Sequence, residues 1–147
     1  MEDWRRYLVQ LETAGIIYGG IVVRPNSSGS GHVKTNGWTH DLTELTALRR
    51  EIDAGKTATK PPPSGETKLL EVQGERFDVR LGAATTGGGK PMLTGICKAA
   101  RTSLAAALAA DGSLVAAIGP LSAGDMASAR CIREVQWIAD MCGPGPR

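Results

Sequence analysis

The sequence has few of the residues that carry metal binding, redox chemistry or membrane insertion. Its 147 residues include three cysteines and two histidines. Neither His32 nor His40 has a cysteine or a carboxylate at metal-ligand spacing, so we expect no metal site and no cofactor. No apolar run approaches the roughly 20 residues of a membrane-spanning helix. The segment MEDWRRY also lacks the order of a signal peptide.

An excess of charge of one sign is also missing. Seventeen lysine and arginine residues face fifteen aspartate and glutamate residues, which gives a net charge of +2. This balance argues against nucleic acid as the main partner. The odd number of cysteines, without metal spacing, fits a reducing compartment. We therefore expect a cytoplasmic protein that does not bind nucleic acid.

No set of residues predicts catalysis. Gly87 to Lys90 (GGGK) shares letters with a phosphate-binding loop, but the leading glycine spacing is missing and Pro91 stands where a serine or threonine is needed. Cys97 lies in the apolar segment LTGICKAA without a cysteine–histidine signature, so we expect a buried thiol. We predict that the protein is not an enzyme.

Length and hydrophobic patterning predict one α+β domain over residues 1–147, with residues 143–147 (GPGPR) as a disordered tail. The expected helices cover residues 2–13, 41–53 and 122–142. The expected strands cover residues 16–23, 32–36, 67–72, 76–81, 92–100, 104–109 and 114–118. The alanine-rich stretch LAAALAA at 104–110 also fits a helix.

This order of elements predicts a central antiparallel sheet of about six to seven strands. The N- and C-terminal helices would lie side by side on one face and the further helix on the other. Gly19 and Gly20 interrupt the first strand, which predicts a close approach of backbone or helix there.

The last helix carries an aromatic residue outside its core stripe. Residues at three-and-four spacing form the expected buried face, namely Ser128, Cys131, Ile132, Val135, Ile138, Ala139 and Cys142. Trp137 falls on the opposite side, together with Met126, Arg130, Arg133 and Met141. Such a tryptophan is either covered by another segment or part of a binding surface. In the first helix, Trp4 and Tyr7 share a face with Leu8 and Leu11, which also fits the core.

The order of elements and four local strings resemble the profilins, a family of small actin-monomer-binding proteins. Trp4-Arg5-Arg6-Tyr7 is similar to the family's Trp-x-x-Tyr start. The strings GETKLLEVQGE (65–75) and FDVRLGAATTGG (77–88) resemble two of its strands with their turns. The closing helix is entered through Gly124 and carries an outward aromatic. The resemblance implies a monomeric cytoplasmic protein of the cytoskeleton that regulates actin polymerisation without catalysing a reaction.

The resemblance also implies a surface for proline-rich ligands, formed by aromatic residues of the two terminal helices. The matching positions are Trp4, Tyr7, His32, Gln136, Trp137 and Met141. His32 stands where the family usually has a further tryptophan, and Trp38 is displaced from that position. We therefore expect a smaller platform and weaker or altered binding of polyproline.

A second surface for actin is implied on the opposite side. The matching positions are Lys68, Leu70, Arg80, Lys90, Gly124, Ala127 and Ser128. Gly82 and Ala84 stand where the family often has basic residues, and residues 111–121 resemble an insertion or an extended hairpin. The basic residues also suggest phosphoinositide headgroups as a further partner.

Two other functions fit the same make-up of helices and sheet. A scaffold subunit of the roadblock or longin type would form a stable dimer and would not need Trp4, Tyr7 and Trp137 to converge. A small sensor domain would need a ligand cavity within its sheet.

Overall fold

The computed structural model describes residues 4–24, 32–39, 41–57, 68–87, 89–124 and 126–142, so the predicted tail at 143–147 and His40 lie outside the described residues. The helices are α1 (Trp4–Thr13), α2 (Leu42–Thr57) and α3 (Ala129–Cys142). The strands are β1 (Gly19–Val23), β2 (His32–Lys34), β3 (Lys68–Val72), β4 (Glu75–Thr85), β5 (Pro91–Cys97), β6 (Thr102–Leu108) and β7 (Leu114–Pro120). They form one seven-stranded sheet in the order β2-β1-β7-β6-β5-β4-β3, with every neighbouring pair antiparallel.

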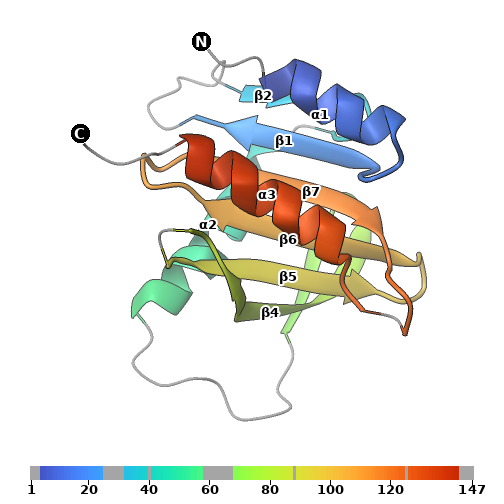
Figure 1. The fold of residues 1–147 in the computed structure, drawn as a ribbon. Helices are drawn as coiled ribbons and strands as arrows, with labels where there is room; N and C mark the ends of the chain where they lie inside the picture. The colour runs from blue at the N-terminus through green and yellow to red at the C-terminus, as the bar shows by residue number, and fades with distance from the viewer. Residues whose placement is uncertain are drawn as a thin grey trace.

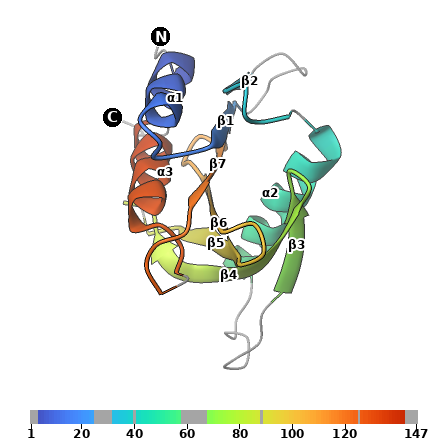
Figure 2. The same cartoon turned by 90° about the vertical axis from the view of Figure 1, so that its right-hand side faces the viewer.

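The helices form two layers around this sheet, as predicted. α1 and α3 lie side by side on one face and α2 lies on the other (Figures 1 and 2). α1 packs on β1 and β2, and α3 packs on β6 and β7. Leu8 and Val135 belong to the core on the α1/α3 side, whereas Trp38, Leu48 and Phe77 belong to the core on the α2 side.

The alanine-rich stretch forms β6 and not a helix. All seven residues of β6 are buried. A strand in the middle of a sheet that is covered on both faces needs apolar residues at consecutive positions, which removes the usual alternation. Asp111 and Gly112 form the predicted turn between β6 and β7, with the Ser113 amide donating to Asp111 Oδ1 over 2.8 Å.

The two glycines of β1 allow the close approach that the sequence predicts. A Cβ at Gly20 would lie 3.2 Å from side-chain atoms of Leu8 and Ile17, so α1 rests directly on β1. A Cβ at Gly19 would lie only 2.6 Å from the carbonyl oxygen of Gly37. The segment after β2 therefore presses against the start of β1.

The last helix begins later than predicted. Residues 122–128 precede α3, and Ser122 forms an isolated bridge with Met126. Gly124 has a φ of 77°, a left-handed conformation that interrupts a helix. Ser128 then caps α3, because its Oγ accepts a hydrogen bond from the Cys131 amide over 3.2 Å. The predicted strand at 92–100 likewise ends at Cys97, where a turn to β6 begins.

Candidate functional site

Three aromatic rings from the two terminal helices meet where α1 and α3 lie together. The ring centroids of Trp4 and Trp137 are 5.6 Å apart and those of Tyr7 and Trp137 are 5.1 Å apart. Trp4 and Tyr7 are 6.1 Å apart, and both Trp4 contacts are edge-on at 80°. The predicted convergence of these residues is therefore present in the structure.

The three rings differ in exposure. Trp4 is 6% exposed and packs with Leu8 and Leu11 in the core, so it forms the buried part of the three-ring cluster. Tyr7 is half-buried, and Trp137 is 44% exposed on the outer side of α3. Met141, one helical turn further along, is 45% exposed and extends the apolar area. We call Trp4, Tyr7, Trp137 and Met141 the aromatic surface.

A carboxylate holds Tyr7 in place from α3. The Tyr7 hydroxyl donates a hydrogen bond to Glu134 Oε1, and Arg130 Nε donates to Glu134 Oε2 over 3.0 Å. Burial, the hydrogen bond and the negative charge of Glu134 raise the pKa of Tyr7 to about 12, while Arg130 opposes the rise. The hydroxyl hydrogen is thus committed to the contact between the helices.

Sequence reasoning missed Glu134. Its position one turn before Trp137 puts it on the same flank of α3, so the helical period alone places it near the aromatic residues. Only the packing of α1 against α3 shows that its partner is Tyr7, 127 positions earlier in the chain.

The aromatic surface offers few hydrogen-bond donors to a ligand. The indole nitrogen Nε1 of Trp4 is buried and has no partner among the described residues. Because the Tyr7 hydroxyl already donates to Glu134, the Trp137 indole N–H is the ring donor that remains on the exposed side. We find no hydrogen bond from it within the described part of the chain. On this surface, the Trp137 indole N–H is therefore the aromatic donor from which a ligand carbonyl can accept a hydrogen bond.

Two of the predicted ligand-binding residues do not join the aromatic surface. The side-chain amide of Gln136 donates a hydrogen bond to the Thr85 carbonyl. Gln136 therefore lies on the flank of α3 that faces the end of β4. His32 pairs with Val23, which packs on the α2 side of the sheet. The neighbouring Val33 packs on the α1 side instead, so strand alternation turns His32 away from the rings.

The residues predicted for actin are divided between the two faces of the sheet. Arg80 pairs with Thr94 on the side that carries α3, and it is exposed. Lys68 forms an ion pair with Glu51 of α2, and Leu70 packs against the core on the α2 side. The physical reason is the register, which pairs Lys68 with Val79 and therefore turns both toward α2.

The same set is also divided between the two ends of the sheet. Lys90 follows β4, and its Nζ lies 3.4 Å from the Ala109 carbonyl beside the turn between β6 and β7. At the other end, the Ser128 amide donates to Ser103 Oγ over 3.1 Å at the start of β6. Ser128 is buried as the cap of α3, whereas Gly124 is exposed and Ala127 half-buried. The predicted residues therefore do not form one patch.

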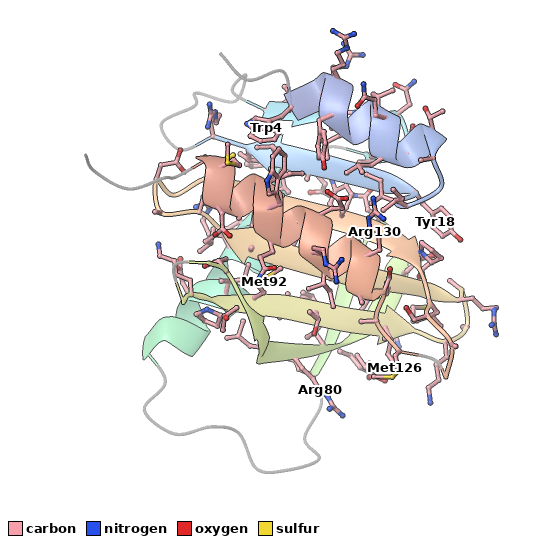
Figure 3. All side chains as sticks on the ribbon, in the orientation of Figure 1. Trp4, Tyr18, Arg80, Met92, Met126 and Arg130 are labelled. Carbon is pink, nitrogen blue, oxygen red and sulfur yellow. The ribbon has the colours of Figure 1, made fainter. Side chains whose placement is uncertain are left out.

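A different group of residues, most of them exposed, lies on the α3 side of β3 and β4 or in the segment before α3. Leu69 pairs with Asp78, and Arg76 and Arg80 occupy alternate positions of β4 on the same side. Leu69 is 57% exposed and Met126, which precedes α3, is 66% exposed. Arg80 and Met126 lie on the same side of the molecule below α3 (Figure 3). We call Leu69, Arg76, Asp78, Arg80 and Met126 the open face.

Metal ligands and reactive thiols were sought among the described residues. Among them, no cluster of three or more His, Cys, Asp or Glu side chains is arranged to hold a metal ion. Cys97, Cys131 and Cys142 are buried thiols, and burial raises the pKa of Cys131 to about 12, which keeps it protonated. None of the described helices is long and apolar enough to cross a membrane.

Comparison with known proteins identifies the fold. The structure is similar to that of Loki profilin 1, solved in a crystal complex with rabbit actin, with a TM-score of 0.56. The similarity covers 98% of this chain and 97% of that chain at 11% sequence identity. The protein thus has a profilin-like α+β fold, as the sequence predicts. No protein-family model matches the sequence, and no curated protein matches it.

Proposed function

We propose that the protein binds monomeric actin and regulates its polymerisation, and that it carries a second surface for proline-rich ligands. The observation that carries this proposal is the meeting of Trp4, Tyr7 and Trp137 across the two terminal helices of a profilin-like fold. The actin bound to the similar Loki profilin supports the choice of partner. In this proposal the protein is a non-enzymatic monomer of the cytoplasm and cytoskeleton. A dimeric scaffold subunit would not require the rings to meet.

The aromatic surface suits a proline-rich segment for physical reasons. Such a segment is already extended as a polyproline helix, so binding costs it little conformational entropy. Trp137 supplies a flat apolar ring and Met141 an exposed apolar side chain, and the Trp137 N–H supplies one hydrogen-bond donor. With a single aromatic donor and without His32 or Gln136, we expect weaker binding than a site with several donors would give.

The open face suits a protein partner. Leu69 and Met126 provide exposed apolar side chains, and Arg76, Asp78 and Arg80 place charged groups on the same side of β4 as Leu69. Apolar anchors with a polar rim are typical of protein interfaces. We assign actin to this face in place of the divided set that includes Lys68, Leu70 and Lys90. The two arginines also suit a phosphoinositide headgroup as a weaker partner.

A pair of charge reversals tests the actin proposal. Arg80→Glu places a negative charge on the open face, whereas Arg50→Glu makes the same change at an exposed position of α2 on the far side of the sheet. We expect Arg80→Glu to weaken binding of actin monomers about tenfold or more. Arg50→Glu should leave it within about twofold. Equal effects of the two variants in a sedimentation assay would refute the assignment of this face.

A second pair of variants tests the proline surface. Trp137→Ala removes the exposed ring and its N–H, so we expect most of the change in tryptophan fluorescence on adding polyproline to disappear. Tyr7→Phe keeps the ring and removes a hydroxyl that is already committed to Glu134. It should therefore keep the affinity within about twofold. The proposal is wrong if the wild-type protein shows no response to millimolar polyproline.

A further inference from the structure

The outer side of α3 changes from cationic to apolar along its length. Four exposed residues follow one another on it at spacings of three and four, namely Arg130, Arg133, Trp137 and Met141. This spacing puts them on one side of the helix. We call these four residues the α3 stripe. Its N-terminal half consists of the two arginines, and its C-terminal half consists of the two exposed members of the aromatic surface.

The guanidinium groups of the α3 stripe can accept a ligand. Arg133 makes no hydrogen bond or ion pair within the described residues. Arg130 uses its Nε for Glu134, but its side chain is 60% exposed and its Nη groups make no hydrogen bond within the same part of the chain. Arg130 lies toward the end of α3 opposite to the one near Trp4 (Figure 3). Two cationic groups therefore continue the aromatic surface along the helix.

The two carboxylates of α3 are each held by groups of the protein itself. Glu134 accepts hydrogen bonds from Tyr7 and Arg130, and its side chain is 12% exposed. Asp140 accepts from the Gly87 amide over 2.8 and 3.0 Å. Asp140 lies beside Met141, seven residues and therefore about 10 Å along the helix from Arg133. The charge of the stripe is thus positive at its N-terminal half, with the remaining negative charge near the apolar end.

We propose that the aromatic surface selects proline-rich segments that carry aspartate or glutamate beside their prolines. This inference rests on the proposed function of that surface and names the class of ligand that it takes. The prolines contact Trp137 and Met141, and the carboxylates pair with Arg133 and Arg130. A guanidinium binds a carboxylate through two parallel hydrogen bonds, which gives direction as well as attraction.

The spacing of the α3 stripe suits such a segment. Arg133 and Arg130 lie four and seven residues before Trp137, which corresponds to about 6 and about 10 Å along the helix. A polyproline helix rises about 3.1 Å per residue. A ligand that runs along α3 therefore brings residues two and three positions from the proline on Trp137 opposite the arginines. Acidic residues at the other end of the ligand would meet Asp140, which repels them.

A peptide suits the α3 stripe better than an anionic membrane does. Clusters of about four to eight basic residues are typical of segments that bind anionic lipid. The stripe has two arginines, and they lie in line with an apolar ring of the kind that prolines contact. Its charge therefore matches a narrow, extended ligand.

Peptides of eight prolines with two further residues at one end test this inference. Blocked peptides that end in two aspartates, or begin with them, are compared with peptides that carry two serines instead. Both orders are used so that the ligand can run in either direction along α3. Tryptophan fluorescence measures the affinity. We expect the aspartate peptide of at least one order to bind about fivefold more tightly at low salt. The preference should disappear in 1 M NaCl, where the Debye length falls to about 3 Å.

A pair of charge reversals locates the effect. Arg133→Glu should abolish or reverse the preference for aspartate. Arg5→Glu is the matched control, because Arg5 is exposed, makes no hydrogen bond or ion pair within the described residues and lies two positions before Tyr7, on the flank of α1 away from α3. It should keep the preference within about twofold. The ratio of the aspartate and serine affinities in one protein is the readout, because a change in the shape of the surface affects both peptides alike.

The outcomes separate this inference from the proposed function. A preference that Arg133→Glu removes and Arg5→Glu keeps supports both. Equal affinities for aspartate and serine peptides, or equal losses of preference in the two variants, overturn the selection of acidic ligands, while peptide binding would still support the ligand surface. Equal affinities together with Arg133-dependent binding to vesicles of phosphatidylserine and phosphatidylcholine would assign the arginines to a membrane and also overturn it. If no peptide binds at millimolar concentration, the proposed ligand and this inference are both wrong.

Discussion

Replacing Tyr7 by phenylalanine removes one hydroxyl at the contact between the terminal helices. That hydroxyl donates to Glu134, and a hydrogen bond to a charged group contributes about 1.5–3 kcal/mol when it is shielded from water. Tyr7 is only half-buried, so screening by solvent reduces the figure to about 1 kcal/mol. We therefore expect Tyr7→Phe to lower the free energy of unfolding by about 1 kcal/mol at pH 7.

The pH dependence gives the same prediction a second test. Burial and Glu134 raise the pKa of Tyr7 in the folded protein from 10.0 to about 12. Because the folded pKa is the higher one, the contribution of Tyr7 is complete below pH 10 and declines as the pH rises toward 12. The full shift corresponds to about 2.7 kcal/mol, and screening leaves about 1 kcal/mol of it. The advantage of the wild-type protein over the phenylalanine variant should therefore disappear near pH 12.

Urea unfolding followed by far-ultraviolet circular dichroism measures both effects. Tyr18→Phe is the matched control, because Tyr18 is 51% exposed and its hydroxyl makes no hydrogen bond within the described residues. It should change the free energy of unfolding at pH 7 by less than about 0.5 kcal/mol. A difference between wild type and Tyr7→Phe that stays constant from pH 8 to pH 12, or that is absent at pH 7, would refute the role given to Glu134.

Two further substitutions test the packing that positions the surfaces. Gly19→Ala puts a Cβ 2.6 Å from the carbonyl oxygen of Gly37, and because backbone cannot yield as a side chain does, we expect a loss of about 3 kcal/mol in urea unfolding. A loss below about 1 kcal/mol would show that the segment after β2 is not held against β1. Ser128→Ala removes the cap of α3 and should cost about 1 kcal/mol. Ser122→Ala is its control and should cost less than about 0.5 kcal/mol, because Ser122 precedes the helix and its hydroxyl makes no hydrogen bond within the described residues. Equal losses from the two serine variants would contradict the capping role.

The position of Trp137 could be predicted because it follows from a local rule. The helical period alone separates it from the stripe of Cys131, Val135 and Ile138, all of which are buried in the structure. The role of Trp4 could not be predicted in this way, since the same helical period fits both a core residue and a residue that contacts a ligand. In the structure it is a core residue that also touches Trp137.

The similarity of local strings to the profilins could not show which side chains of β3 and β4 lie on which face of the sheet. Lys68 and Leu70 are two positions apart in a strand, so they share one face of the sheet. Which face this is depends on how β3 pairs with β4. The apolar residues Phe77 and Val79 mark the α2 side of β4, and the register carries Lys68 and Leu70 to that side. Exposed members of the open face such as Leu69 become recognisable only after this pairing is known.

The proposed function requires two separate surfaces that hold actin and a proline-rich ligand at the same time. Trp137 lies on the flank of α3 that meets α1, whereas Arg80 lies on β4, on the same face of the sheet but away from α1. Sedimentation velocity of the protein mixed with monomeric actin from the same organism and labelled decaproline measures this directly. We predict one boundary that contains all three components. A boundary without actin, or peptide that is released when actin is added, would contradict the proposed function.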